Sequence, residues 1–193
     1  MKLKEQASRD KLRGGFYTPV PIAKFILRWG LVNNNESDIL EPSCGDGNFL
    51  RALNELHVKF NSLTAIEFDQ EEYYKASNIL IENTQILNLD FHDFCVNTNR
   101  RFDLIVGNPP YIRYQFFEKE QQELAIQIFS KSGLKYSKLT NAWVSFVVGA
   151  SQLLKDKGKI GFVLPAEILQ VSYAKQLRTF LASKFNKINI ISF

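Results

Sequence analysis

Near its middle the chain reads Phe102-Asp103-Leu104-Ile105-Val106-Gly107-Asn108-Pro109-Pro110-Tyr111. The apolar first part is typical of a buried strand in a parallel sheet. The second part places an amide, two prolines and an aromatic ring at the carboxyl end of this strand, where open α/β sheets bind their ligands. The prolines fix the backbone and remove two N–H donors, which leaves carbonyl groups to accept. The tetrapeptide therefore suits a flat substrate that carries an amino group.

Strand-like and helix-like stretches alternate along the whole chain. This alternation is typical of a parallel sheet with helices on both faces. We therefore expect an α/β fold with a doubly wound, mostly parallel sheet, in a single domain over residues 1–193. The expected strands are 38–41, 62–67, 85–89, 102–107, 159–164 and 187–193, and the expected helices are 21–30, 48–58, 70–83, 118–130, 141–155 and 172–184.

Composition narrows the class of protein. The length of 193 residues suits one α/β domain, and the formal charge of +4 is compatible with a polyanionic partner but too small to argue for one. Cys44 and Cys95 are too few for a disulfide framework, so we expect a reducing cytoplasm. The sequence shows no signal peptide and no uncharged run of membrane-spanning length. His57 and His92 lack the spacing of a zinc site, so no metal is expected.

A glycine-containing loop follows the first expected strand and reads Glu41-Pro42-Ser43-Cys44-Gly45-Asp46-Gly47-Asn48-Phe49. Its glycines permit a tight turn and close approach by a ligand, and the next helix offers free N–H groups. The third glycine of a dinucleotide fingerprint is replaced by Leu50, and no Gly-Lys-Ser/Thr of a phosphate loop follows. An acidic residue at the strand end repels a pyrophosphate and attracts a cation. The loop is therefore either a plain turn or, as we expect, a site for a cationic ligand.

Glu67 ends the second expected strand, 20 residues after Gly47. A carboxylate at this place in nucleoside-binding sheets accepts hydrogen bonds from ribose hydroxyls. Upstream of the first strand, the segment Gly14-Gly15-Phe16-Tyr17-Thr18-Pro19 has two readings. It is a flexible entry to the first helix, or a lid over the charged end of the ligand with Thr18 as a hydrogen-bonding residue.

Two acidic–aromatic pairs follow the third expected strand, Asp90-Phe91 and Asp93-Phe94. An acceptor beside a ring suits an adenine, because the amino group of the base donates while its face stacks. Both pairs fit this pattern and the register stays open. We favour Asp93-Phe94.

With these elements in this order, the chain resembles the amino-DNA methyltransferases that use S-adenosylmethionine. More narrowly, it is similar to the N6-adenine enzymes of restriction–modification systems whose cofactor motifs precede the catalytic one. The resemblance implies a Rossmann-like class I methyltransferase fold. The matching stretches are Phe16-Tyr17-Thr18-Pro19, Glu41-Pro42 with Gly45 and Gly47, Ile66-Glu67-Phe68-Asp69, Asp93-Phe94, Asn108-Pro109-Pro110-Tyr111 with Ile112-Arg113, and Gly161-Phe162-Val163-Leu164-Pro165.

The resemblance also implies roles for individual residues. Thr18 and the backbone of residues 42–47 hold the methionine moiety and the sulfonium, Glu67 takes the ribose hydroxyls, and Asp93 with Phe94 takes the cofactor adenine. Asn108 and the Pro109 carbonyl accept from the target amine, and Tyr111 stacks on the target base. The implied cofactor set is Tyr17, Thr18, Glu41, Pro42, Cys44, Gly45, Gly47, Glu67, Asp93, Phe94 and Asn108, and the implied catalytic set is Asn108, Pro109, Pro110 and Tyr111.

Chemistry accounts for these residue types. The adenine amine is a poor nucleophile because its lone pair is delocalised into the ring. Two acceptors draw it toward tetrahedral geometry and aim it at the methyl group, so catalysis is chiefly positioning. The base must leave the duplex first, and a ring such as Tyr111 holds it outside. The partners implied are double-stranded DNA with a flipped adenine and a nuclease or target-recognition polypeptide.

The chain departs from the family pattern at its end. These enzymes continue past the sixth strand into a hairpin and a target-recognition domain, whereas this sequence stops at Phe193. We therefore expect a catalytic domain truncated at the sixth strand, whose activity alone is open. Protein-glutamine methyltransferases share the tetrapeptide, so a protein or RNA methyltransferase is the alternative, and a non-enzymatic binding module is a third. Arg113, Tyr114, Phe116 and Phe117 contact DNA, cover the substrate or belong to the core.

Overall fold

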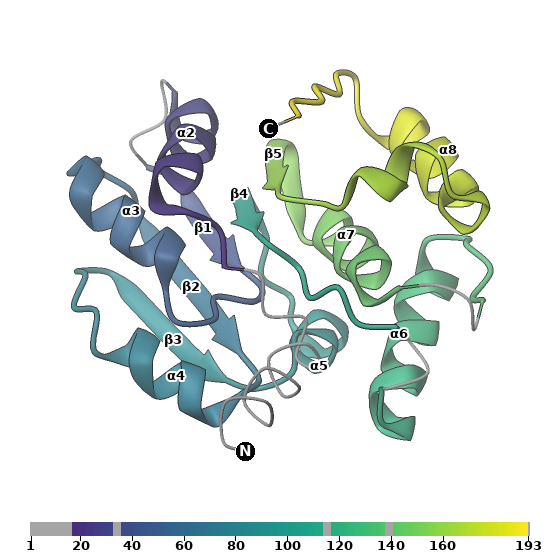
Figure 1. Cartoon of the computed structure of the whole chain (residues 1–193), viewed down its shortest axis with the longest axis horizontal. Helices are drawn as coiled ribbons and strands as arrows, with labels where there is room; N and C mark the ends of the chain where they lie inside the picture. The colour runs from purple at the N-terminus through teal and green to yellow at the C-terminus, as the bar shows by residue number, and fades with distance from the viewer. Residues whose placement is uncertain (1–16, 33–35, 114–116, 138–140, 193) are drawn as a thin grey trace, which may run out of the picture.

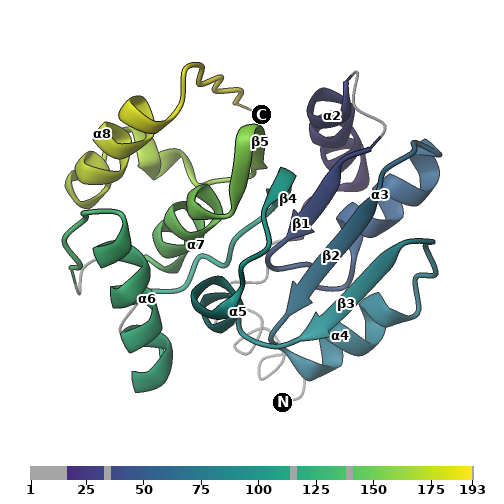
Figure 2. The ribbon, with the colours of Figure 1, turned by 180° about the vertical axis from the view of Figure 1, so that it is seen from behind.

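The computed structural model describes residues 17–32, 36–113, 117–137 and 141–192. Five parallel strands form one sheet in the order β3-β2-β1-β4-β5 (Figures 1 and 2). The α/β fold with a parallel sheet is thus confirmed. The strands are β1 (Asp38–Glu41), β2 (Ser62–Glu67), β3 (Thr84–Asn88), β4 (Phe102–Gly107) and β5 (Leu154–Phe162).

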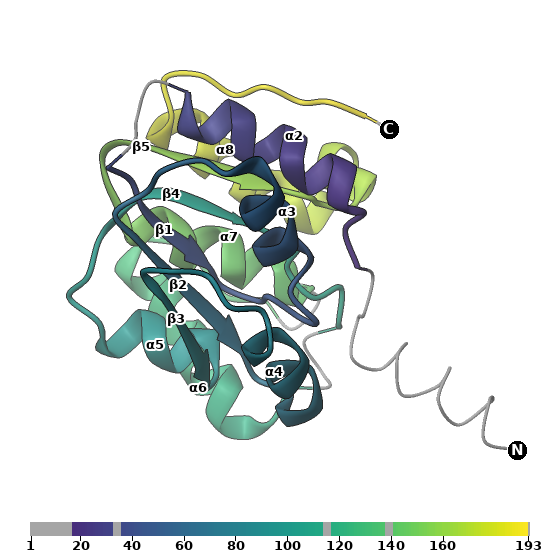
Figure 3. The same ribbon diagram turned by 90° about the vertical axis from the view of Figure 1, so that its left-hand side faces the viewer.

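Helices cover both faces of the sheet, as the doubly wound pattern requires (Figure 3). The helices are α2 (Val20–Leu31), α3 (Asn48–Leu56), α4 (Gln70–Ser77), α5 (Phe91–Asn97), α6 (Lys119–Lys131), α7 (Ala142–Gln152) and α8 (Lys175–Lys184), with 3₁₀ turns η2 (Ala166–Leu169) and η3 (Ser172–Ala174). No helix in the described part of the chain is both long and apolar enough to cross a membrane.

Alternation along the strands divides the core into two. Ile39 of β1 and Leu104 of β4 pack with α2 and α3 on one face. Their neighbours Leu40 and Ile105 pack with α5 and α7 on the other face. All four side chains are fully or almost fully buried, so each strand is apolar on both sides.

The order of the strands creates a switch point between β1 and β4. From β1 the chain moves outward to β2 and β3, then returns to the other side of β1 to form β4 and β5. The connection after β1 leads toward β2 and the connection after β4 leads toward β5, so a crevice opens between them at the carboxyl ends of the strands. Glu41, Glu67 and Asn108 all lie at this edge.

Several parts of the sequence-based assignment are wrong. The helix expected over 70–83 ends at Ser77. A short helix, α5, occupies residues 91–97, where no helix was expected. Asp90 caps this helix, and its seven residues are too few to show a helical pattern in the sequence. Strand β5 begins at Leu154 and not at residue 159, with a register shift opposite Phe102 and Leu104. Residues 187–192 form no strand, since within the described chain they pair with no strand of the sheet.

At the opposite edge of the sheet, Lys155 joins two strands. Its Nζ lies 2.7 Å from Asp38 Oδ2 and 2.8 Å from Asp103 Oδ2. Burial raises the pKa of Asp38, but hydrogen bonds from Lys155, Ser62 and Asn61 outweigh it and lower the pKa to about 2. The lysine therefore keeps two neighbouring carboxylates ionised at the amino ends of β1 and β4.

Replacing Lys155 by Met is expected to lower the free energy of unfolding at pH 7 by about 1 kcal/mol, because both carboxylates lose their shared cation while solvent screens part of the effect. The pKa of Asp38 is lowered in the folded state. Its contribution to the free energy of unfolding is therefore fully present above pH 3.8 and is lost as the pH falls through about 2. Urea unfolding of both proteins between pH 7 and pH 2 measures the difference. A difference that stays constant over this range contradicts the assignment, and the exposed Lys157 replaced by Met is the control.

Candidate functional site

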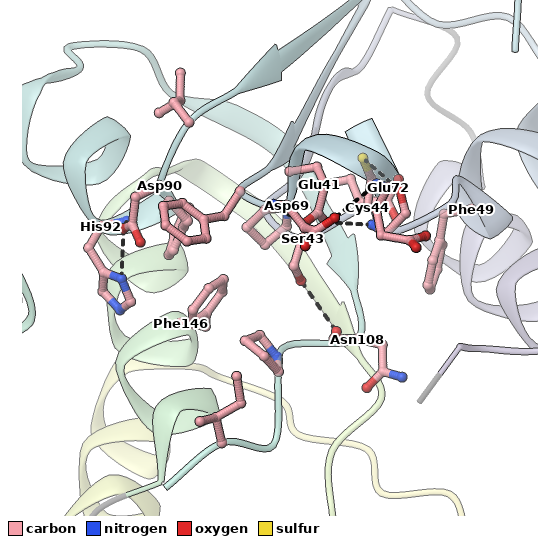
Figure 4. Close-up of a pocket in the computed structure, with 18 of the residues that line it drawn as sticks. Glu41, Ser43, Cys44, Phe49, Asp69, Glu72, Asp90, His92, Asn108 and Phe146 are labelled. Atoms are coloured by element: carbon pink, nitrogen blue, oxygen red, sulfur yellow. Dashed lines mark hydrogen bonds and ion pairs between the residues drawn. The ribbon is translucent and has the colours of Figure 1, made fainter. Parts of the chain in front are cut away.

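A cavity of about 370 Å³ opens at the carboxyl ends of β1, β2 and β4. Its walls come from the loop after β1, the end of β2, the residues after β3, the tetrapeptide after β4 and the start of α6. Figure 4 shows Glu41, Asp90 and Asn108 in these walls. The cavity thus lies at the switch point of the sheet. The sequence-predicted residues that line it are Tyr17, Thr18, Glu41, Pro42, Cys44, Gly45, Glu67, Asn108 and Pro110, whereas Gly47, Asp93, Phe94, Pro109 and Tyr111 do not.

The loop after β1 is held tightly against the end of β2. The Cys44 N–H donates to the Ile66 carbonyl at 2.9 Å, and the Gly45 N–H donates to Glu67 Oε2 at 2.7 Å. Gly45 and Gly47 both adopt left-handed backbone, with φ of 55° and 95°. A Cβ on Gly47 would lie 2.5 Å from Cδ1 of Ile79, behind the loop. Gly47 therefore shapes the site without touching the cavity.

The cavity is strongly acidic. Its lining carboxylates are Glu41, Glu67, Asp69, Glu72, Asp90 and Glu118, and among the described residues no Lys or Arg lines it. Lys75 pairs with Glu72 from outside the wall at 2.6 Å. The excess of carboxylates in the crevice favours a positively charged ligand over a phosphate. In the described part of the chain, no cluster of His, Cys, Asp and Glu has the arrangement of a metal site.

Glu41 is the most constrained of these carboxylates. It is 2% exposed, and its Oε2 has no hydrogen-bond partner among the described residues. Burial, with the nearby charges of Glu67 and Asp46, raises the pKa of Glu41 well above its usual range. Oε2 of Glu72 and the hydroxyl of Thr18 are buried in the same wall and also lack a partner among the described residues. Buried polar groups usually have a hydrogen-bond partner, and none of the described residues supplies one to these three.

At the far end of the cavity the structure favours the earlier acidic–aromatic pair. Asp90, Phe91 and His92 line the cavity, whereas Asp93 is exposed and accepts from Asn97 Nδ2 at 2.8 Å. Asp90 accepts from the His92 N–H at 2.6 Å and so caps α5. Burial alone would raise the pKa of Asp90, but hydrogen bonds from His92 and Gln121 lower it. The carboxylate therefore stays ionised and can accept.

The tetrapeptide after β4 is divided between the cavity and the core. Asn108 and Pro110 line the cavity, and the Asn108 carbonyl accepts from Ser43 Oγ at 3.3 Å (Figure 4). Pro109 is buried. The Tyr111 hydroxyl donates to the Val163 carbonyl at 3.1 Å, and burial raises its pKa to about 12. Tyr111 is thus fixed between β4 and the end of β5.

Sequence reasoning missed several residues of the cavity wall. Phe68 directly follows Glu67 and is 62% exposed at the cavity, so its position beside a motif was a usable signal. Phe117, whose role the sequence left open, lines the cavity just before α6, and Gln121 comes from the first turn of α6, to which no local pattern pointed. Tyr114 and Phe116, left open from the sequence, lie outside the described residues, as does the segment Gly14–Phe16.

Comparison with known proteins identifies the family. A model of the Eco57I restriction-modification methylases matches residues 20–193. The chain belongs to this family. The type II methyltransferase M.AccI of Acinetobacter calcoaceticus is 29% identical over 169 residues, covering 86% of this chain and 30% of that methylase. M.HincII of Haemophilus influenzae is 30% identical over 182 residues, covering 93% and 33%. The chain therefore spans about a third of the length of these relatives.

Solved structures agree with this membership at the level of the fold. A protein from Listeria monocytogenes designated a class I S-adenosylmethionine-dependent methyltransferase superposes with a TM-score of 0.69 at 17% identity, covering 85% of this chain and 50% of that one. A protein from Vibrio vulnificus YJ016 designated a modification subunit of a type I restriction enzyme gives 0.66 at 19% identity, covering 93% and 41%. The methylase chain thus has the Rossmann-like fold of class I methyltransferases.

The glycine loop gives a direct test of the site's construction. Gly47→Ala is expected to lower the free energy of unfolding by about 2 kcal/mol or more, because left-handed strain and the contact with Ile79 act together. Gly133 also has a positive φ, of 67°, but no atom lies within 4 Å of its added Cβ. Gly133→Ala therefore measures the backbone strain alone. Equal losses in the two variants, measured by denaturant unfolding, would contradict the close packing behind the loop.

Proposed function

We propose that this chain is the catalytic domain of a DNA methyltransferase that transfers a methyl group from S-adenosylmethionine to N6 of adenine within a restriction–modification system. The observation that carries the proposal is an acidic cavity at the switch point of the sheet, directly beside Asn108 and Pro110. Family membership supports DNA methylation in such a system. The choice of adenine rests on the tetrapeptide and its neighbours.

The cofactor fits the charges of the cavity. S-adenosylmethionine carries a sulfonium, which supplies the methyl group, and an ammonium group on its amino acid end. Glu41, with its buried and unpartnered Oε2 among the described residues, suits the ammonium group, and Thr18 suits the carboxylate of the same moiety. Burial of Glu41 without a partner destabilises the empty protein, and a bound cation would offset this loss of stability. Gly45 lines the cavity and, without a side chain, leaves room there for the cofactor.

The nucleoside end fits the remaining acceptors. Each Glu67 oxygen already accepts one backbone N–H, from Gly45 and from Asp69, which fixes the carboxylate in place. An ionised carboxylate has further lone pairs, so it can also accept from ribose hydroxyls. Asp90 replaces Asp93 in our proposal as the acceptor for the adenine amino group, with Phe68 and Phe91 beside it at the cavity.

The target base would lie against the tetrapeptide. The Asn108 side chain and the Pro109 carbonyl accept from the adenine amine, and no N–H of either proline competes. The Tyr111 ring is anchored through its hydroxyl at Val163, so it can stack on a flipped base without moving far. Positioning of the amine is then the main contribution of the chain to catalysis.

Partners and location follow from the same proposal. The substrate is double-stranded DNA, and a nuclease or target-recognition polypeptide would act with the methylase. Since the chain spans about a third of its relatives, recognition of a DNA sequence is assigned to other parts of a longer enzyme or to a partner. The reaction would take place in the cytoplasm, where the DNA lies.

Replacing Glu41 by Gln separates binding from stability. Affinity for S-adenosylmethionine is expected to fall about tenfold to a hundredfold, because a charge-assisted hydrogen bond is lost. The free energy of unfolding of the ligand-free protein is expected to rise, since an unpaired buried carboxylate is removed. Calorimetry and urea unfolding measure the two effects. The exposed Glu82 replaced by Gln is the control. If Glu41→Gln binds S-adenosylmethionine as tightly as the wild type, Glu41 does not bind the cofactor.

The pH dependence has a defined sign. Because the pKa of Glu41 is raised in the folded state, the folded protein binds the proton more tightly than the unfolded one. Lowering the pH toward this raised pKa therefore stabilises the ligand-free wild type more than Glu41→Gln. Unfolding curves at several pH values check this, and parallel curves for the two proteins would contradict it.

Asn108→Ala tests the catalytic assignment. Methyl transfer by the complete gene product is expected to fall about 100-fold or more, a larger loss than that of cofactor affinity, because one acceptor for the amine is lost. Labelled methyl transfer to DNA, RNA and protein, with mass spectrometry of the DNA nucleosides, measures the product. The exposed Asn97 replaced by Ala is the control. Label in protein or RNA alone, or N4-methylcytosine in DNA, would overturn the proposed function.

A further inference from the structure

Asp90 is the centre of a hydrogen-bond network that draws on three helices. His92 of α5 contacts Asp90 Oδ1 through Nδ1 at 2.9 Å, and its Nε2 lies 2.7 Å from Ser145 Oγ of α7. Gln121 of α6 donates from Nε2 to Asp90 Oδ2 at 2.6 Å. Both oxygens of the carboxylate are therefore held, each from a different side. Figure 4 shows His92 and Asp90 at one end of the cavity.

Counting donors fixes the proton on one side of the imidazole. An ionised carboxylate only accepts, so Nδ1 of His92 must carry the proton that faces Asp90. The Ser145 hydroxyl has a single proton and contacts both His92 Nε2 and the Ala142 carbonyl, at 2.7 and 2.8 Å. Whichever of these two accepts it, Nδ1 remains a donor toward Asp90. The network thus enforces an acceptor at the cavity.

Gln121 is constrained in the same way. Its Oε1 accepts from the Glu118 N–H at 3.2 Å, at the start of α6, so its Nε2 is directed to Asp90. The amide cannot be flipped without placing two acceptors together at Asp90. Phe117 packs edge-on against the His92 ring, with 5.4 Å between ring centroids. The start of α6 therefore fixes Asp90 from outside the core.

The order Asp90–His92–Ser145 resembles a nucleophilic triad in its distances but not in its exposure. Ser145 is fully buried and does not line the cavity, whereas the carboxylate at the other end does. A nucleophile must reach its substrate, so this serine cannot act as one. The same contacts instead hold Asp90 in a fixed position relative to α7. The Asp90 carboxylate is the group of this network that can contact a ligand in the cavity.

We propose that Ser145, His92 and Gln121 are positioning residues that hold Asp90 as an acceptor, so that the cavity selects a purine with an amino group at C6 over one with an oxo group. This inference rests on the proposed function, because it assumes that the nucleoside end of the cofactor lies at Asp90. An oxo group would face a carboxylate that is held by its partners and cannot turn away. A site built to pair with an amino group rejects a ligand that lacks it, since its own polar group is left unpaired.

The test compares two ligands that differ at C6 and at the adjoining N1, which is unprotonated in adenine and carries a proton in the 6-oxo purine. S-adenosylhomocysteine and its deaminated analogue S-inosylhomocysteine are titrated against the wild-type chain by calorimetry. We expect wild type to prefer the amino form by about 30-fold or more. Ser145→Ala and Gln121→Leu are expected to reduce this preference at least about fivefold, because each removes one partner of the network without removing Asp90.

Matched controls lie on the same helices. Ser151 of α7 is also buried and bonds a backbone carbonyl, of Val147 at 2.8 Å, but it does not touch the network. Gln122 neighbours Gln121 and bonds the Phe117 carbonyl. Ser151→Ala and Gln122→Leu should leave the preference unchanged. If Ser145→Ala and Gln121→Leu weaken both ligands equally, the residues are structural only and the inference is overturned while the proposed function stands. If wild type binds neither ligand, the proposed function fails.

A spectroscopic measurement covers the case in which a variant does not fold. The chain has two histidines, so His57→Gln assigns the imidazole signals of His92 in a nitrogen-15 spectrum. We expect Nδ1 to be protonated in the wild type. An unprotonated Nδ1 would contradict the donor count and with it the proposed network.

Discussion

The carboxylate of Glu67 is the contact on which the site depends. Its two oxygens accept from Gly45 on the loop after β1 and from Asp69 at the start of α4, at 2.7 and 2.8 Å. One side chain at the end of β2 therefore fixes the glycine loop and the first turn of the next helix. Cys44 adds a backbone bond to Ile66 beside it. Without this junction the acidic wall of the cavity would have no fixed shape.

The acidic wall carries a cost that the fold alone does not explain. Burial raises the pKa of both Glu41 and Glu67, and Glu72 lies close enough to add to the effect on Glu67. A stable protein gains nothing from crowding carboxylates in a crevice, since each opposes the ionisation of the others. A cationic ligand reverses the sign of the interaction. If Glu41 binds the cofactor as we propose, the stability of the empty methylase and its affinity for the cofactor are opposed at this residue.

Much of the fold was readable from the sequence because apolar runs, glycines and prolines are local signals. Four strands and the loop after β1 lie where the pattern placed them, to within a residue. The choice between Asp90 and Asp93 was not readable, because it depends on α5, a helix too short to show a period. Once Asp90 caps that helix, Asp93 falls in its first turn and points to solvent. The sequence indicated both aspartates as candidates, but it did not predict the short helix that places Asp90 at the cavity and Asp93 in solvent.

Other failures have long-range causes. Gln121 reaches the cavity only because α6 packs against α5, which no pattern within α6 reveals. The stretch 187–192 has the composition of a strand, yet a strand exists only where a neighbour pairs with it. Both cases show that local propensity decides what a segment can form. Tertiary contacts decide whether it forms and what it faces.

The central claim is that the cavity holds S-adenosylmethionine with its nucleoside at Glu67 and Asp90. A crystal structure of the chain with S-adenosylhomocysteine tests this most directly. We expect ribose hydroxyls within hydrogen-bond distance of Glu67 and the adenine amino group within hydrogen-bond distance of Asp90. An adenine placed beside Asp93, or a ligand bound outside the acidic cavity, would contradict it.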